Sequence, residues 1–112
     1  MDESPEKRCS NNSHAMAIRL AALSHPARIE ILKRLSASRC CSCREVVDHL
    51  DLAQSTVSQH LKVLVEAGLV RFEADRQRSR YAVDHAALAG VSASLTELVD
   101  SCCPSHSSKR QD

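Results

Sequence analysis

Apolar residues recur at helical spacing along most of the chain, and their pattern predicts five helices and one β-hairpin. Residues 13–23 are apolar and alanine-rich, which favours a first helix. Pro26 suits the first turn of a second helix, which we expect to end near Leu35. A last helix, capped by Asp84, carries an apolar stripe and ends before Pro104. The stripe consists of Leu88, Val91, Leu95, Leu98, Val99 and Cys102.

The pattern in the middle of the chain predicts two helices joined by a short turn. Ser42 and Glu45 have the spacing of a capping box, so a third helix is expected over residues 43–50. A fourth helix is expected over residues 54–67, because Gly68 stands where a helix stops. The two together predict a helix-turn-helix.

The fourth helix has one apolar face and one polar face. Its apolar residues are Val57, Leu61, Leu64 and Val65. The other face carries short hydrogen-bonding side chains and one cation, which suit base edges and phosphates. We therefore predict that this helix enters the major groove of DNA. The predicted DNA-binding residues are Gln54, Ser55, Thr56, Ser58, Gln59, His60 and Lys62. For His60, packing against the preceding helix is the open alternative.

Two short β-like runs, residues 69–73 and 80–83, flank a basic segment and predict a β-hairpin. No glycine marks the turn, so the turn type stays open. Arg76 and Arg78 lie at the predicted tip, where they can reach a phosphate or the minor groove. The alternative is that both arginines lie in a solvated turn and do not contact DNA.

Length and composition predict one small, mainly α domain over residues 13–103, between polar tails at 1–12 and 104–112. The formal net charge is +1, so any affinity for nucleic acid must come from a local patch. No apolar run approaches the roughly 18 residues of a membrane span. The polar N-terminus is unlike a secretory signal, so we expect a cytoplasmic protein without a membrane partner.

The predicted order of helix, helix, helix-turn-helix, hairpin and helix is that of a winged helix-turn-helix. With ALSHPARIEIL from Ala22 and STVSQHLKVLVEAGLV from Ser55, the chain resembles the ArsR/SmtB family of metal-responsive repressors over about residues 14–103. The resemblance implies a homodimer held by the first and last helices. It also implies a palindromic operator that is released when an inducer binds. The two-fold symmetry of a homodimer fits a palindromic operator, because it places the two DNA-contacting helices about one DNA turn apart.

Six cysteines fall into three groups. The groups are Cys9, then Cys40, Cys41 and Cys43, and finally Cys102 and Cys103. Because no export signal is visible, reduced thiols are expected rather than a disulfide scaffold. Adjacent or alternating cysteines are too close for the usual zinc spacing. As(III) and Sb(III) instead take three soft thiolates in a pyramid, which closely spaced thiols can supply.

The resemblance to arsenic-responsive members of the family implies an inducer site at Cys102 and Cys103. The Cys-x-Cys that some members carry on the third helix falls here on Ser42 and Arg44, so that site is not carried over. The family's zinc site on the last helix lacks its histidines. We predict As(III) or Sb(III) as the inducer. The predicted ligands are Cys102, Cys103 and, as a third thiolate, Cys41 or Cys43.

Three alternatives differ in what the cysteines do. The same fold can act as a thiol redox or persulfide sensor, with a disulfide between the two cysteine clusters replacing the metalloid. The protein can also bind DNA with no inducer. A small thiol enzyme is disfavoured, because the first cysteine cluster does not follow a predicted strand and no phosphate loop is visible. We therefore expect no catalytic residues.

Overall fold

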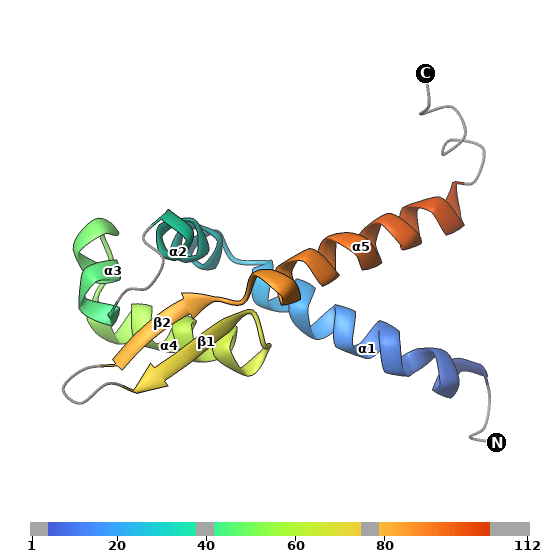
Figure 1. Ribbon diagram of the computed structural model, residues 1–112, viewed down its shortest axis with the longest axis horizontal. Coiled ribbons are helices and arrows are strands. Elements are labelled where there is room, and N and C mark those ends of the chain that lie inside the picture. Colours follow the sequence, from blue (N-terminus) through green and yellow to red (C-terminus); the bar gives the residue numbers. More distant parts are fainter. Residues whose placement is uncertain (1–4, 38–41, 75–78, 104–112) are drawn as a thin grey trace.

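The computed structural model describes residues 5–37, 42–74 and 79–103. Its elements are α1 (Pro5–Leu23), α2 (Pro26–Ala37), α3 (Cys43–His49), α4 (Gln54–Glu66), β1 (Val70–Ala74), β2 (Ser79–Val83) and α5 (His85–Cys102). Helices α2, α3 and α4 and the hairpin form a body from which α1 and α5 project and diverge (Figure 1). This confirms the predicted mainly α fold with a β-hairpin wing.

Helix α1 begins at Pro5, whereas the apolar pattern predicted a start at Ser13. Once a helix is nucleated, backbone hydrogen bonds extend it through polar residues as well, so apolar spacing underestimates its length. Proline is also favoured in the first helical turn. Residues 5–12, which we predicted to belong to a polar tail, are therefore part of α1. The division into one domain and two tails otherwise stays a prediction.

The start of α3 has the predicted capping box. The backbone N–H of Glu45 donates to Ser42 Oγ at 3.2 Å, and the backbone N–H of Ser42 donates to Glu45 Oε1 at 2.9 Å. These two bonds satisfy donors that have no partner inside the helix. They fix where the helix-turn-helix begins.

Helix α4 ends in a Schellman motif around Gly68. The backbone N–H of Leu69 donates to the carbonyl of Leu64, and that of Gly68 donates to the carbonyl of Val65, both at 3.0 Å. Gly68 has φ of +81°, a conformation that side chains with a Cβ rarely adopt. The predicted glycine stop is confirmed, and it turns the chain from α4 into β1.

The hairpin is antiparallel and pairs Val70 with Val83 and Phe72 with Tyr81. Val70 and Val83 are buried at the end nearest the body, which anchors the wing to the core. Residues 75–78 lie outside the described residues. The predictions for Arg76 and Arg78 therefore stay predictions.

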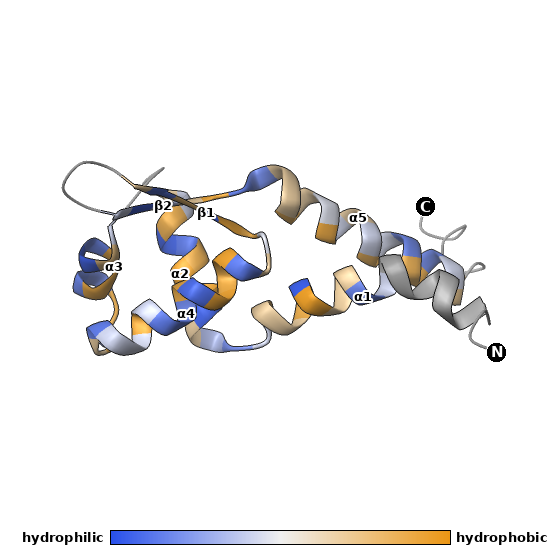
Figure 2. Ribbon diagram, turned by 90° about the horizontal axis from the view of Figure 1, so that it is seen from below, coloured by the Kyte–Doolittle hydropathy of each residue, from blue (hydrophilic) through white to orange (hydrophobic). Residues whose placement is uncertain are grey.

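The core is aliphatic, as the near absence of aromatic residues predicts. Its largest fully buried side chains are Ile31, Leu35, Leu61, Leu64, Leu69, Val46 and Val57. Helix α5 starts at its predicted cap, where Asp84 Oδ1 accepts from the backbone N–H of Ala87 at 3.1 Å. It then leaves the body, so that Leu95 is 41% exposed and Leu98 is 48% exposed. Figure 2 shows apolar segments on both projecting helices.

No helix in the described part of the chain is long and apolar enough to cross a membrane.

Candidate nucleic-acid interface

Helix α4 presents its polar face to solvent because its apolar face is anchored in the core. Val57, Leu61 and Leu64 are fully buried. The residues predicted to contact DNA on the opposite face are exposed: Gln54, Ser55, Thr56, Ser58, Gln59 and Lys62. A helix whose exposed face carries hydrogen-bonding side chains and one cation suits direct reading of base edges and contact with phosphates.

The first turn of α4 is also open to an acceptor. Its N-cap residue is Ala53, whose methyl side chain cannot accept a hydrogen bond from the first amide groups of the helix. Ser55 and Thr56 stand exposed in that turn. Amides at a helix N-terminus favour anionic groups, so this end of α4 suits a phosphate.

A hollow of about 410 Å³ separates α4 from the wing. Ser58, Gln59 and Lys62 line its helix side. Phe72 and Tyr81 line its wing side, with ring centroids 5.3 Å apart, and Phe72 is 47% exposed. The sequence prediction missed both aromatic residues as members of this surface. The available signal was their position two residues from Val70 and Val83, on the same side of each strand.

His60 lies on the side of α4 that faces α2. Arg28 Nε donates to His60 Nδ1 at 3.2 Å, and the His25 ring lies 4.5 Å from the His60 ring. Arg28 Nη1 also bonds the carbonyls of Ala21 and Ala22, both at 3.3 Å. These contacts favour a packing role for His60 over a contact with DNA, although its partners belong to α2 and the turn before it and not to the preceding helix, α3.

The surroundings of His60 predict an acid-sensitive contribution to stability. Partial burial, and then the positive charges of His25 and Arg28, lower the pKa of His60. The folded state therefore binds a proton at His60 less readily than the unfolded state, in which the histidine pKa is about 6.5. Stability from this site is present above that pH and is lost as the pH falls through the folded-state pKa.

The variant His60→Asn keeps a neutral acceptor for Arg28 but cannot be protonated. We expect its free energy of unfolding to fall less than that of the wild type between about pH 7.5 and about pH 5. Urea unfolding at the two pH values measures this difference. Equal losses in the two proteins would show that His60 does not titrate against folding.

The structure separates the cysteines that the sequence grouped as candidate ligands. Cys102 ends α5 and Cys103 follows it, and both are exposed. Cys43 begins α3 at the opposite end of the molecule (Figure 1). Within one chain, Cys43 therefore does not meet the pair. Cys41 lies outside the described residues, and among those described no three potential ligands gather at one point.

Cys43 is also a weak candidate for a thiolate. It is half-buried, and this burial raises the pKa of its thiol. A metal or metalloid binds the deprotonated form, so a raised pKa opposes binding. Cys43 lines a polar hollow with Ser58 and Tyr81, and its charge adds to burial in raising the pKa of Tyr81.

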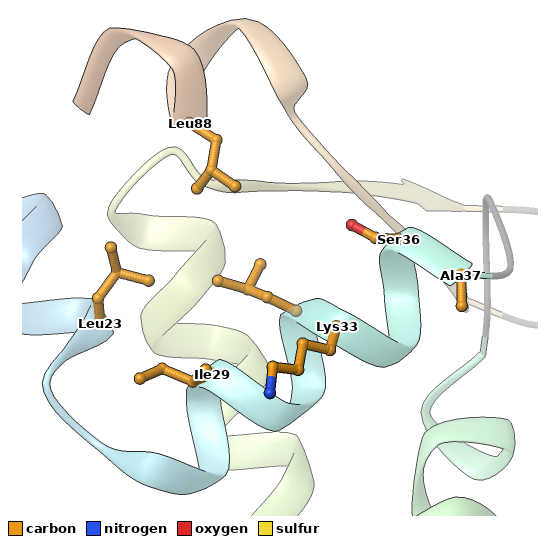
Figure 3. A pocket seen from close by; sticks show the side chains of 7 residues that line it. Leu23, Ile29, Lys33, Ser36, Ala37 and Leu88 are labelled. Atoms are coloured by element: carbon orange, nitrogen blue, oxygen red, sulfur yellow. The ribbon is translucent and has the colours of Figure 1, made fainter. Parts of the chain in front are cut away.

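A third hollow, which is apolar, lies where α1, α2 and α5 meet (Figure 3). Leu23, Ile29, Leu32 and Leu88 line it, with the Lys33 side chain at its edge. No residue that the sequence singled out for DNA or inducer binding lies in this hollow.

Comparison with known proteins also indicates a helix-turn-helix regulator. A helix-turn-helix domain family matches residues 23–71. The HTH-type transcriptional regulator YgaV of Escherichia coli (strain K12) is 35% identical over 85 residues, which cover 76% of this chain and 83% of that protein. The arsenical resistance operon repressor of Staphylococcus xylosus is 36% identical over 66 residues, which cover 59% of this chain. That match spans only 62% of the repressor.

A solved ArsR-like transcriptional regulator from Rhodococcus sp. RHA1 shares the fold. It superposes with a TM-score of 0.78 at 24% identity, over 90% of this chain and 94% of its own. These similar proteins are described as regulators, which agrees with the prediction that the chain is not an enzyme. The winged helix-turn-helix architecture is therefore supported by the contacts within the chain and by its relatives.

Proposed function

Because this chain belongs to the ArsR/SmtB family of winged helix-turn-helix regulators, we propose that it is a transcriptional repressor that reads operator DNA with α4. The observation that carries the proposal is the exposed polar face of α4, held outward by three fully buried residues, Val57, Leu61 and Leu64. The protein acts where the DNA is, which we take to be the cytoplasm.

The hollow between α4 and the wing suits the sugar–phosphate strand of the operator. A helix in the major groove and a wing at the adjacent minor groove are separated by one backbone strand, which must cross this hollow. Lys62 offers a cation to its phosphates, and the exposed edge of Phe72 offers apolar contact to a deoxyribose. Phosphate contacts of this kind fix register, while Ser58 and Gln59 read the bases.

Two chains bind an inverted-repeat operator as a homodimer. The exposed large apolar residues of the projecting helices favour an interface between copies: Ile18, Leu95, Leu98 and Val99. Contiguous exposed apolar surface on a small domain marks an association site. A two-fold axis through these helices relates two α4 helices, so the two half-sites must run in opposite directions.

As(III) or Sb(III) releases the operator by binding Cys102 and Cys103 together with a third thiolate. Each sulfur replaces one hydroxide of the metalloid hydroxide, and the thiol proton leaves with it as water, so no oxidant is needed. The exposure of both thiols at the end of α5 supports their access to the inducer. Since Cys43 of the same chain lies at the far end, the third thiolate comes from the partner or from another cysteine of the chain.

A thiol redox or persulfide sensor on the same fold is the second candidate. The observation that favours it is the exposure of two adjacent cysteines at one helix end. Treatment with polysulfide or peroxide would then release DNA without any metalloid.

Two substitutions on α4 separate base reading from phosphate binding. We expect Gln59→Ala to weaken operator binding by about 1–3 kcal/mol, with little change for unrelated DNA. We expect Lys62→Ala to weaken binding to all sequences and to lower the salt slope by about 1. Fluorescence anisotropy at several salt concentrations measures both effects. Lys33→Ala, at an exposed site on α2 away from this face, is a matched control. Wild-type binding by both test variants would contradict the assignment of this face.

A gel shift on the DNA upstream of the protein's own gene tests the proposed function. The reduced protein is expected to shift this fragment and not unrelated DNA. Among As(III), Sb(III), Cd(II), Zn(II), peroxide and polysulfide, only As(III) and Sb(III) are expected to release it. Release by polysulfide or peroxide alone would favour the redox sensor. A fragment that does not shift specifically would contradict the repressor.

A further inference from the structure

Arg19 of α1 joins the projecting helices to the end of the recognition helix. Its Nε donates to the backbone carbonyl of Ala67 at 3.2 Å. Ala67 is the C-cap residue of α4, where carbonyl groups have no partner within the helix. A cation at this end also interacts favourably with the helix dipole. The two residues are 48 positions apart in the sequence, and their hydrogen bond joins α1 directly to α4.

Both glycines of the chain lie against the same guanidinium group. A Cβ on Gly68 would lie 3.4 Å from Arg19 Nη2, and a Cβ on Gly90 would lie 3.9 Å from Nη1. Gly68 follows the end of α4, and Gly90 lies in α5. The half-buried Arg19 head therefore lies between α4 and α5 while its backbone belongs to α1. One side chain of α1 therefore bonds the end of α4 and lies close to Gly90 of α5.

Two bonds from Arg28 of α2 to the carbonyls of Ala21 and Ala22 also hold α1 to the body. The remaining packing of α1 and α5 on the body is apolar. Ala22 and Val91 are buried in the core, and Leu88 packs against it. Apolar packing is not directional, so it permits a helix to rotate or slide a little. A hydrogen bond is directional, and its strength falls steeply with misalignment. Among the described contacts of α1 with α4, Arg19 supplies a bond with a defined direction.

We propose that Arg19 is a positioning residue that sets the orientation of α4 relative to α1 and α5, and thereby the separation of the two reading helices in the dimer. The inference rests on the proposed function, because it needs α4 to read DNA and the projecting helices to form the dimer. A tilt at the Arg19 contact is magnified over the distance from the dimer axis to the operator half-site. Arg19 thus determines which half-site spacing the dimer accepts.

The test is a spacing profile of operator affinity for the full chain. A set of inverted repeats is made in which the distance between half-sites is one or two base pairs shorter or longer than the natural distance. Each added base pair turns one half-site by about 35° relative to the other. Arg19→Met keeps the aliphatic stem and removes the guanidinium. Lys33→Met removes the same charge from an exposed site on α2 and is the matched control.

We expect the wild type and Lys33→Met to lose about tenfold or more in affinity when the spacing changes by one base pair. For Arg19→Met we expect this loss to fall below about threefold, while affinity for a single half-site and the dimer mass stay unchanged. A merely structural role would lower affinity for every spacing equally and leave the profile unchanged. Arg19→Lys, which keeps the charge but cannot contact both glycines, is expected to relax the profile too.

Each outcome decides a different claim. If Arg19→Met and Arg19→Lys keep the wild-type profile, the positioning role is wrong and the proposed function stands. If the wild type itself prefers no inverted repeat over unrelated DNA, the proposed function is wrong, and the inference falls with it. Should Arg19→Met fail to fold, as judged by circular dichroism, the Arg19→Lys profile alone decides the positioning role.

Discussion

Replacing Leu95 by glutamate is expected to give a folded monomer without measurable operator affinity. Leu95 is 41% exposed and does not belong to the core, so the domain should survive the change. In a two-fold dimer each large side chain of the α5 stripe contributes roughly 1.5–3 kcal/mol when it is buried. Glutamate removes that contribution from both chains and brings two like charges close to the axis.

Sedimentation velocity and operator anisotropy measure the two consequences of Leu95→Glu. The matched control is Ala93→Glu, which adds the same charge two residues away on the exposed opposite side of α5. The control is expected to stay dimeric and to bind DNA. A wild-type monomer at micromolar concentration, or a dimeric Leu95→Glu, would contradict an interface through this stripe.

Replacing both Cys102 and Cys103 by serine is expected to leave DNA binding intact and to abolish release by arsenite. Both residues are exposed at the end of α5, so neither supports the core or the reading face. Release requires that arsenite bind the DNA-free form more tightly, and typical allosteric couplings are about 1–3 kcal/mol. Without two of three thiolates, that difference in affinity disappears.

Cys43→Ser then identifies the third thiolate. If Cys43 of the partner completes the site, this variant loses arsenite release as well. If release persists, the third thiolate comes from Cys9, Cys40 or Cys41. Normal arsenite release by the Cys102→Ser/Cys103→Ser protein would move the inducer site to other cysteines. Release of the wild type by Zn(II) alone would contradict the metalloid inducer.

Features that depend on neighbouring residues were predictable from the sequence. The capping box at Ser42 and Glu45, the glycine stop at Gly68 and the two faces of α4 each follow from spacing within one or two helical turns. Local hydrogen bonds and side-chain periodicity determine such features. The same local reasoning failed at Pro5, where a helix extends beyond its apolar part.

Features that depend on contacts between distant residues were not predictable. The bond from Arg19 to Ala67 and the pairing of Arg28 with His60 join positions 48 and 32 apart. The pairing of Phe72 with Tyr81 depends on the hairpin register. The separation of Cys43 from Cys102 results from α5 leaving the body (Figure 1), which residue spacing does not encode. The candidate inducer site was therefore less predictable than the reading helix.

Hydroxyl-radical footprinting of the reduced protein on the DNA upstream of its own gene tests the central claim most directly. A repressor that reads an inverted repeat with two α4 helices is expected to protect two symmetric segments about one helical turn apart. Gln59→Ala should weaken both segments together, and arsenite should remove both. A single protected segment, protection that does not depend on sequence, or protection unchanged by Gln59→Ala would contradict the account.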